Sequence, residues 1–194
     1  MNAARHLPAL AFALLLPSLA AAQGWPAKPI RMIIPFPPGG PTDLMGRMAA
    51  DRLSKGLSVQ VVADNRGGAG GNIGFEQCAK SPADGYTICG MTVAQSISPG
   101  IYRKLGYDLS KDFTFITLMA TLPSMLTSHP SFPAKNVKEV IAVAKSRPGQ
   151  IVYSSTGNGT SPHMLMEMFK SMAGINMVHV PYKGQAQSVI DQIS

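Results

Sequence analysis

The stretch IRMIIPFPPGGPTD, residues 30–43, joins an apolar run to a turn rich in proline and glycine and then to the start of a helical pattern. Residues 30–36 are predicted to form a buried strand, because short apolar runs bounded by turn residues are typical of parallel sheets. Residues 42–55 are predicted to form a helix, since their apolar side chains recur at helical spacing. A strand that passes through a glycine turn into a helix is the repeating unit of α/β proteins.

The same alternation continues along the chain and predicts a mainly parallel α/β fold. Further strands are expected at 59–63, 86–91, 150–154 and 177–180, and further helices around 73–78, at 137–146, at 162–172 and from 185 onward. Two more strands are expected at 115–120 and 124–128, where an extended connection between two lobes would fit. We therefore expect a first lobe at 23–122 and a second lobe at 123–194.

The N-terminal 22 residues have the three parts of a secretory signal peptide. Arg5 and His6 precede an apolar run at 7–16, and three alanines at 20–22 supply a cleavage pattern. The apolar run is shorter than the ~20 residues that span a bilayer, so a membrane anchor is not expected. The alternative is a buried N-terminal helix, which leaves the small residues unexplained. Residues 1–22 are thus predicted to direct export to the periplasm.

Composition narrows the function classes. The formal net charge is +7, but the lysines and arginines are dispersed and form no basic stripe, so a nucleic-acid partner is not expected. A mildly basic protein favours small anionic ligands through long-range attraction. His129, His163 and His179 are widely spaced and fall in no Cys/His ligand pattern, so neither a metal site nor a cofactor is expected.

The two cysteines, Cys78 and Cys89, lie eleven positions apart, one late in a predicted helix and the other in the next strand. A disulfide is open to an exported chain if the two Cα atoms lie within about 7 Å. The interpretation we favour is two small buried hydrophobic residues, the commoner state of cysteine.

Two strand-to-helix loops, 35–43 and 154–163, are built alike and are expected to face each other. Thr42 is the expected cap of the first helix, and Ser161 caps the second with Pro162 in its first position. A helix N-terminus presents unpaired N–H groups and about half a positive charge, which suits a carboxylate or phosphate. The alternative is a pair of ordinary β–α turns. The glycine-rich segment 65–71 matches no nucleotide-binding pattern and is interpreted as a helix-entry turn.

Nucleophilic catalysis has three candidates, namely Ser154, Ser155 and His163. The chain has no Gly-x-Ser-x-Gly elbow and offers no evident acidic partner, so an enzyme is not expected. An exported serine hydrolase stays as an alternative.

Five segments together resemble one protein family. They are residues 28–31, 35–43, 65–74, 84–87 and 178–184. In this order they resemble the Bug family, the extracytoplasmic solute receptors of tripartite tricarboxylate transporters, and the resemblance runs from Trp25 to Ser194. It implies a type II periplasmic binding protein fold, in which two α/β lobes enclose a ligand cleft. Family members continue for well over a hundred residues past the last segment, so the resemblance implies a second lobe that is incomplete and truncated at its C-terminus.

The resemblance also implies a function and a site. A monomeric receptor would capture a small organic acid, without catalysis, and deliver it to a large and a small integral membrane subunit. The alternative is a loaded receptor that docks on a membrane sensor kinase. Ligand carboxylates would be held by backbone amides and water at loops of both lobes. The residues carried over are Phe36, Pro37, Gly39, Gly40, Thr42, Asp43, Thr92, Thr156, Gly157, Gly159, Thr160 and His163.

Overall fold

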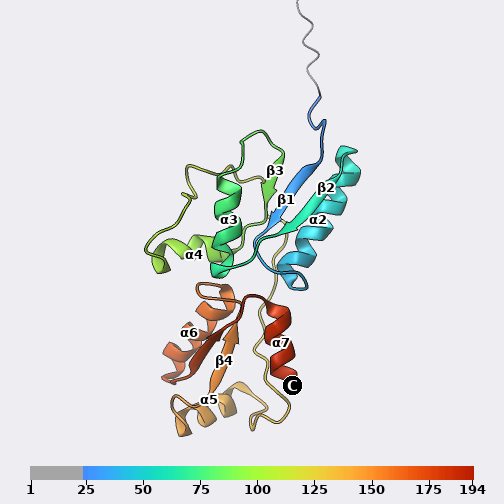
Figure 1. Cartoon of the computed structure of the whole chain (residues 1–194). Coiled ribbons are helices and arrows are strands. Elements are labelled where there is room, and N and C mark those ends of the chain that lie inside the picture. The colour runs from blue at the N-terminus through green and yellow to red at the C-terminus, as the bar shows by residue number, and fades with distance from the viewer. Residues whose placement is uncertain (1–23) are drawn as a thin grey trace, which may run out of the picture.

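A computed structural model describes residues 24–194, so the predicted signal peptide lies outside the described residues. Two α/β lobes are joined end to end, as Figure 1 shows. The first lobe contains β1 (Ile30–Ile34), α2 (Pro41–Leu57), β2 (Val61–Asn65), the short 3-10 helix η2 (Ala69–Gly71), α3 (Asn72–Ala79), β3 (Thr87–Cys89) and α4 (Val93–Ile101). The second contains α5 (Val137–Ser146), β4 (Val152–Ser155), α6 (Ser161–Ala173), β5 (Val178–Pro181) and α7 (Gln185–Ile193). No helix in the described part of the chain has the length and apolar character needed to cross a membrane.

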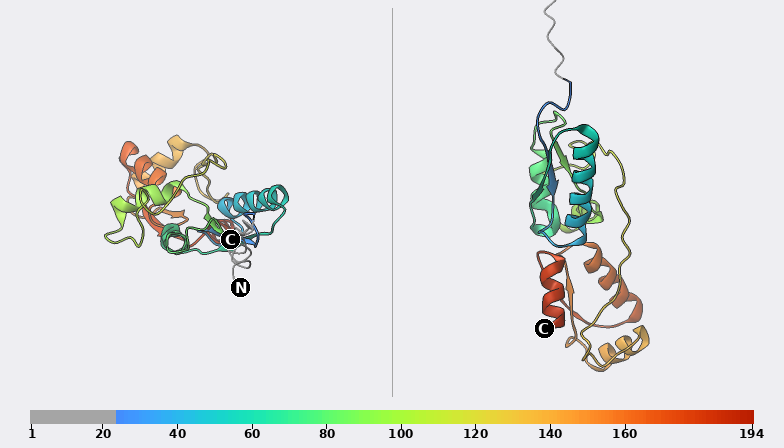
Figure 2. Two further views of the ribbon diagram at one scale, coloured as in Figure 1. Left: turned by 90° about the horizontal axis from the view of Figure 1, so that it is seen from above. Right: turned by 90° about the vertical axis from the view of Figure 1, so that its right-hand side faces the viewer.

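The first lobe is built on a parallel three-stranded sheet in the order β2-β1-β3. β1 is central and almost fully buried, with Ile33 at 0% and Ile34 at 1% exposure, which explains why its sequence reads as one continuous apolar run. Helices α2 and α3 cover opposite faces of this sheet (Figure 2). On the α2 side, Ala50 packs with Ile30, Met32 and Val61.

The second lobe has a parallel pair of strands, β4 and β5, covered by helices. Its core brings Ala144 of α5 against Tyr153 of β4 and against Ile175 and Met177, which lead into β5. Each lobe therefore buries an apolar cluster of its own. Independent cores of this kind let two lobes move as units about a connection.

The helices and strands predicted from the alternating pattern are present, with ends that differ by a few residues. The two strands predicted at 115–120 and 124–128 are wrong. This segment runs extended along the molecule between the lobes but pairs with no strand of the described residues, and Ile116 and Leu118 are each 80% exposed. The apolar residues there matched a strand pattern, but a strand also needs a neighbouring backbone with which to form hydrogen bonds.

One helix was missed. α4 follows β3 directly, and its sequence carries Pro99 and Gly100, which disguise a helix. Thr92 begins it with a capping box, in which the Thr92 hydroxyl accepts from the Ala94 amide and the Gln95 side chain accepts from the Thr92 amide. The Thr-x-x-Gln spacing was the signal that predicts this helix start.

Both predicted helix caps are one or two residues too late. Gly40 is the N-cap of α2, because Pro41 occupies the first helical position, where its missing N–H costs nothing. Thr160 is the N-cap of α6, and Ser161 is already helical. Thr42 and Ser161 therefore do not cap these helices.

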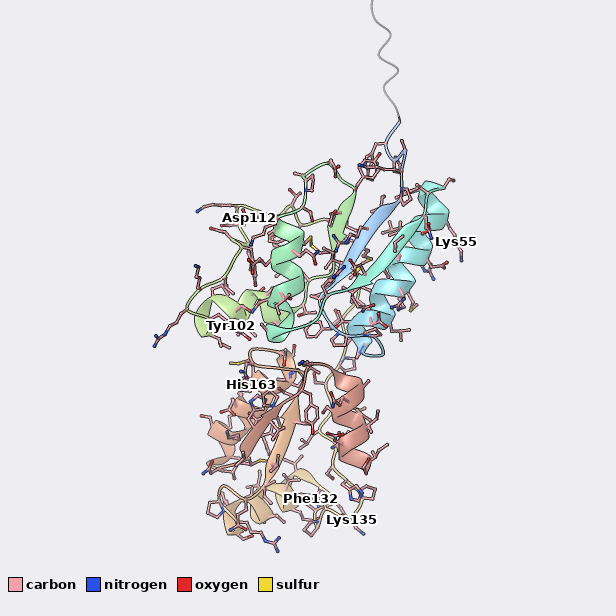
Figure 3. All side chains as sticks on the ribbon, viewed as in Figure 1. Lys55, Tyr102, Asp112, Phe132, Lys135 and His163 are labelled. Carbon is pink, nitrogen blue, oxygen red and sulfur yellow. A yellow bond between two sulfur atoms is a disulfide. The ribbon has the colours of Figure 1, made fainter. Side chains whose placement is uncertain are left out.

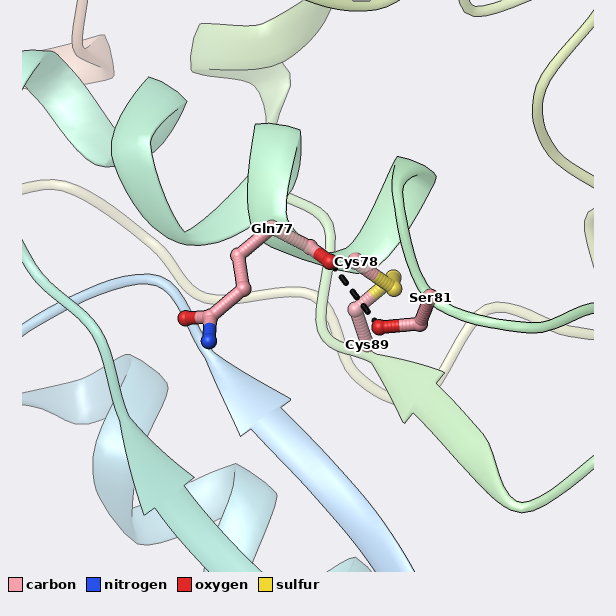
Figure 4. The surroundings of a disulfide bond; sticks show 4 residues. All are labelled: Gln77, Cys78, Ser81 and Cys89. Carbon is pink, nitrogen blue, oxygen red and sulfur yellow. Dashed lines mark hydrogen bonds between the residues drawn. A yellow bond between two sulfur atoms is a disulfide. The ribbon is translucent and has the colours of Figure 1, made fainter.

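Cys78 and Cys89 form a disulfide, which corrects the expectation of two separate buried thiols. Their Cα atoms lie 6.3 Å apart, because the end of α3 packs beside β3 (Figure 4). The Ser81 hydroxyl closes the same helix end by donating to the Gln77 carbonyl at 2.9 Å. The bond therefore ties α3, and the glycine turn before it, to the sheet.

Replacing both Cys78 and Cys89 by serine is expected to lower the free energy of unfolding by about 3 kcal/mol, because a bridge across a loop of this size restricts the unfolded chain. Urea unfolding followed by circular dichroism measures the loss. Reductant should lower the midpoint of the wild type and leave that of the double variant unchanged. An equal midpoint for wild type and variant without reductant would contradict the expectation.

Candidate ligand site between the lobes

A cavity of about 170 Å³ lies where the two lobes meet. Its lining residues are Gly68, Ala69, Gly70 and Tyr102 of the first lobe and Thr156, Gly157, Asn158, Pro181, Tyr182 and Lys183 of the second. Pockets for drug-sized ligands usually occupy roughly 300–1,000 Å³, so this cavity suits a smaller molecule.

Backbone atoms of two glycine-bearing loops meet at this cavity. A Cβ atom built on Gly70 would lie only 2.6 Å from the Asn158 carbonyl oxygen, and one built on Gly157 would lie 3.4 Å from the Gly70 Cα atom. Both glycines have positive φ angles, +65° and +126°, a conformation that other residues rarely adopt. The Tyr102 hydroxyl reaches across the junction to the Asn158 carbonyl at 3.4 Å. Glycine at these positions therefore permits the lobes to touch.

A second contact between the lobes involves the loop before α2. Gly39 and Gly40 face Ala186 and Gln185 at the start of α7, where a Cβ on either glycine would lie 3.5 or 3.8 Å from the opposing Cβ. Loop 154–163 instead faces the glycine turn at 68–70. Loops 35–43 and 154–163 thus both lie at the junction, and each contacts a different segment of the other lobe.

Asp43 is directed into its own loop. Its carboxylate accepts from the Gly39 amide at 3.0 Å, from Arg47 at 2.9 Å and from the Asn65 side chain at 2.8 Å, and the residue is 5% exposed. Burial by itself would raise the pKa of Asp43, but these hydrogen bonds outweigh it and hold the pKa below its ordinary value. Asp43 therefore positions the loop before α2.

The remaining residues expected at the site fall into two groups. Thr156 and Gly157 line the cavity, whereas Phe36, Pro37, Gly39, Gly40, Thr42, Asp43, Thr92, Gly159, Thr160 and His163 are not among its lining residues. Thr92 is engaged in the cap of α4, and Ile101 at the end of that helix lies 3.1 Å from a Cβ built on Gly159. Figure 3 shows Tyr102 and His163 on facing ends of the two lobes.

Side chains behind the cavity tie loop 154–163 together. Ser155, which is 2% exposed, places its hydroxyl 2.6 Å from His179 Nε2, and the same oxygen accepts from the Gly157 amide at 3.1 Å. The pair Ser155 and His163, considered as hydrolase candidates, is thus not formed, because His163 Nδ1 accepts from the Gly159 amide at 3.2 Å. A buried hydroxyl already bound to its own loop is badly placed to attack a substrate.

The electrostatics of the junction favour an anion. The N-terminal ends of α2, α3, α6 and α7 all lie at the junction (Figure 1), and each carries roughly half a positive charge. Of the described residues that line the cavity, Lys183 alone is charged. No group of three His, Cys, Asp or Glu side chains within residues 24–194 is placed to hold a metal ion.

Comparison with known proteins identifies the family. A model of the family described as "Tripartite tricarboxylate transporter family receptor" matches residues 45–194. The chain belongs to this receptor family. The members are solute-binding receptors rather than enzymes, and the resemblance seen in the sequence is confirmed.

Individual receptors of the family show the same relationship. Protein BugT of Bordetella pertussis is 35% identical over 196 residues, which cover 98% of this chain and 60% of that protein. The solved structure "R. palustris Rpa4515 with adipate" is 37% identical with a TM-score of 0.84, and that of the periplasmic binding protein BugD is 32% identical with a TM-score of 0.76. Each of these two structural comparisons covers 87% of this chain and 56% of the other. The chain thus spans little more than half the length of these receptors, and its type II periplasmic binding protein fold is confirmed.

The cavity of this receptor involves segments that sequence reasoning set aside. Gly68, Ala69 and Gly70 belong to a turn that was interpreted as a helix entry, and this turn and the segment 181–183 otherwise contributed only to the family resemblance. Tyr102 gave no signal, since it ends the helix that was missed. The glycine content of 65–71 was the one available indication that a backbone approaches closely there.

Substituting Gly70 by alanine is expected to hold the lobes apart, because the added Cβ would overlap the Asn158 carbonyl. Small-angle X-ray scattering should report a larger radius of gyration for this variant. Gly174→Ala is the matched control, since Gly174 also has a positive φ of +61° but no atom within 4 Å of its Cβ position. The expectation fails if both variants scatter alike.

Proposed function

We propose that this chain is a periplasmic receptor that captures a small organic carboxylate in the cavity between its lobes and delivers it to a tripartite tricarboxylate transporter. The observation that carries the proposal is a small cavity lined largely by the glycine-bearing segments that lead into three helix N-termini, those of α3, α6 and α7. Such a site binds negative charge without needing a dedicated ion pair.

The two walls of the cavity suggest how an acid with two carboxylates is held. One carboxylate lies against Thr156, Gly157 and Asn158, just before α6, and the other against Gly68 to Gly70, just before α3. Lys183 adds the single full positive charge. Closure of the lobes excludes water, and the lower effective dielectric strengthens each of these interactions.

The residues expected from the resemblance keep a place in this proposal. The loop from Phe36 to Asp43 contacts the start of α7 and so helps to set how the lobes meet. Hydrogen bonds of Gly159, Thr160 and His163 hold the loop that contains Thr156 and Gly157. Tyr102 spans the two walls and limits the length of the ligand. The related structure solved with adipate, at 37% identity, supports a dicarboxylate as the ligand class.

Delivery follows from closure. Ligand binding favours the closed arrangement of the lobes, in which the surfaces of both are held in one relative orientation. A large and a small integral membrane subunit would recognise that arrangement on a monomeric receptor and accept the ligand from it.

Isothermal titration calorimetry against adipate, shorter dicarboxylates, a tricarboxylate and a neutral diamide of adipic acid tests the proposal. We expect saturable binding of at least one acid and none of the diamide. A folded protein that binds no acid in the panel, or that binds the diamide equally well, would refute it.

Lys183→Gln is expected to weaken the binding of adipate about fivefold, or roughly 1 kcal/mol, because the lysine is exposed and its charge is partly screened by solvent. Lys138→Gln removes a charge that is also exposed, on α5, and should leave the affinity unchanged. The same calorimetric titration measures both variants. Equal losses in the two would mean that only net charge matters and that Lys183 does not contact the ligand.

A further inference from the structure

Two histidines behind the cavity form a cluster with no part in the proposed ligand contacts. The rings of His163 on α6 and His179 on β5 are stacked with their centroids 4.2 Å apart and their planes inclined by 22°. The ring of Tyr153 on β4 is also stacked with that of His179, at a centroid distance of 4.9 Å. Neither imidazole is among the residues that line the cavity.

Each imidazole is bound to the loop that does line it. His163 Nδ1 accepts the Gly159 amide hydrogen at 3.2 Å, and His179 Nε2 lies 2.6 Å from the Ser155 hydroxyl, which in turn accepts the Gly157 amide hydrogen at 3.1 Å. The cavity-lining residues Thr156 to Asn158 are therefore held from both sides by a histidine.

The contact to Gly159 gives His163 Nδ1 the role of hydrogen-bond acceptor. Only an unprotonated ring nitrogen can accept a hydrogen bond from an N–H group, so Nδ1 of His163 carries no proton in this arrangement. Adding a proton there would set two donors against each other and remove the bond. By contrast, His179 Nε2 can either accept from or donate to the Ser155 hydroxyl.

We infer that His163 and His179 are positioning residues that hold the loop from Thr156 to Thr160 in its ligand-binding shape, and that acid pH weakens carboxylate binding because the bond from Gly159 needs an unprotonated Nδ1 on His163. The inference rests on the proposed function. Histidine changes charge between about pH 5 and 8. A receptor in the periplasm would be exposed to changes of external pH in this range.

The charged and titratable groups around the pair determine the sign of this effect. On α6, Glu167 accepts from Lys170 at 2.7 Å and also from the Tyr153 hydroxyl, which is part of β4. The Lys170 hydrogen bond, with that from Tyr153, holds the pKa of Glu167 below its ordinary value, so its carboxylate stays ionised and offsets a charge on His163. The first lobe presents Tyr102, through Asn158, and the apolar side chain of Ile101.

Protonation of His163 would have two effects on ligand affinity. The new positive charge would attract an anionic ligand, but the ionised Glu167 largely compensates this charge. The lost bond to Gly159 would loosen the loop that lines the cavity. The second effect dominates, and affinity falls with acid. The stacked partner acts in the same direction: burial lowers the pKa of His179 and the nearby His163 lowers it further, so the fold favours neutral His179. The stabilising contribution of neutral His179 is present at neutral pH and is lost as the pH falls below about 6.5.

Calorimetric titration with adipate at pH 7.5 and pH 5.5 tests the inference. The wild type should bind about three- to tenfold more weakly at pH 5.5, as expected for the loss of one hydrogen bond. His163→Asn keeps an acceptor near the Nδ1 position without titrating, and its affinity should change less than twofold beyond the effect of ligand ionisation. His129→Asn, in the exposed segment between the lobes, should retain the pH dependence of the wild type.

The amide signal of Gly159 in ligand-free protein provides a second measurement that needs neither ligand nor variant. Its nitrogen chemical shift, followed by NMR from pH 8 to pH 5, should move with a single titration in the wild type. No titration of that amide, or equal pH dependence of binding in wild type and His163→Asn, overturns the inference. If the wild type binds no acid at pH 7.5, the proposed function fails, and the Gly159 signal still decides whether the histidines hold the loop.

Discussion

The arrangement of this receptor depends on one constraint: backbone from two separate lobes must approach closely at the ends of their parallel strands. Strands β1 and β4 each deliver the chain to this junction, and the helices that follow begin there. Gly70 and Gly157 meet without side chains between them. The buried Asp43 carboxylate holds the loop before α2 at the junction, and the disulfide at the far end of α3 ties that helix to the sheet.

Much of the fold follows from local sequence. The apolar run of β1, the glycine turns and the helical spacing after them predict an α/β protein with two lobes, because buried parallel strands have a distinctive composition. What failed depends on neighbours. Residues 115–128 have the composition of strands but no neighbouring strand among the described residues to pair with. Pro99 argues against a helix at α4, and only the capping box at Thr92 indicates one. The disulfide depends on how α3 packs beside β3, which spacing alone does not give.

The candidate site was only half predictable for a similar reason. Sequence indicated which loops precede helices, since proline, glycine and hydroxyl residues have known preferences at those positions. It could not indicate which loop meets which across the junction, because this depends on the orientation of one lobe relative to the other. Loop 154–163 therefore meets the turn at 68–70, and His163 faces its own loop instead of the cavity.

The contact between Gly70 and Gly157 means that different parts of the junction hold the lobes together and line the cavity. The lobes touch here through main chain, so this contact does not depend on the side chains that surround it. Tyr102, Tyr182 and Lys183 supply the large side chains of the cavity lining. Substitutions at these three positions would therefore alter the shape and charge of the cavity, while the main-chain contact that brings the lobes together is left as it is.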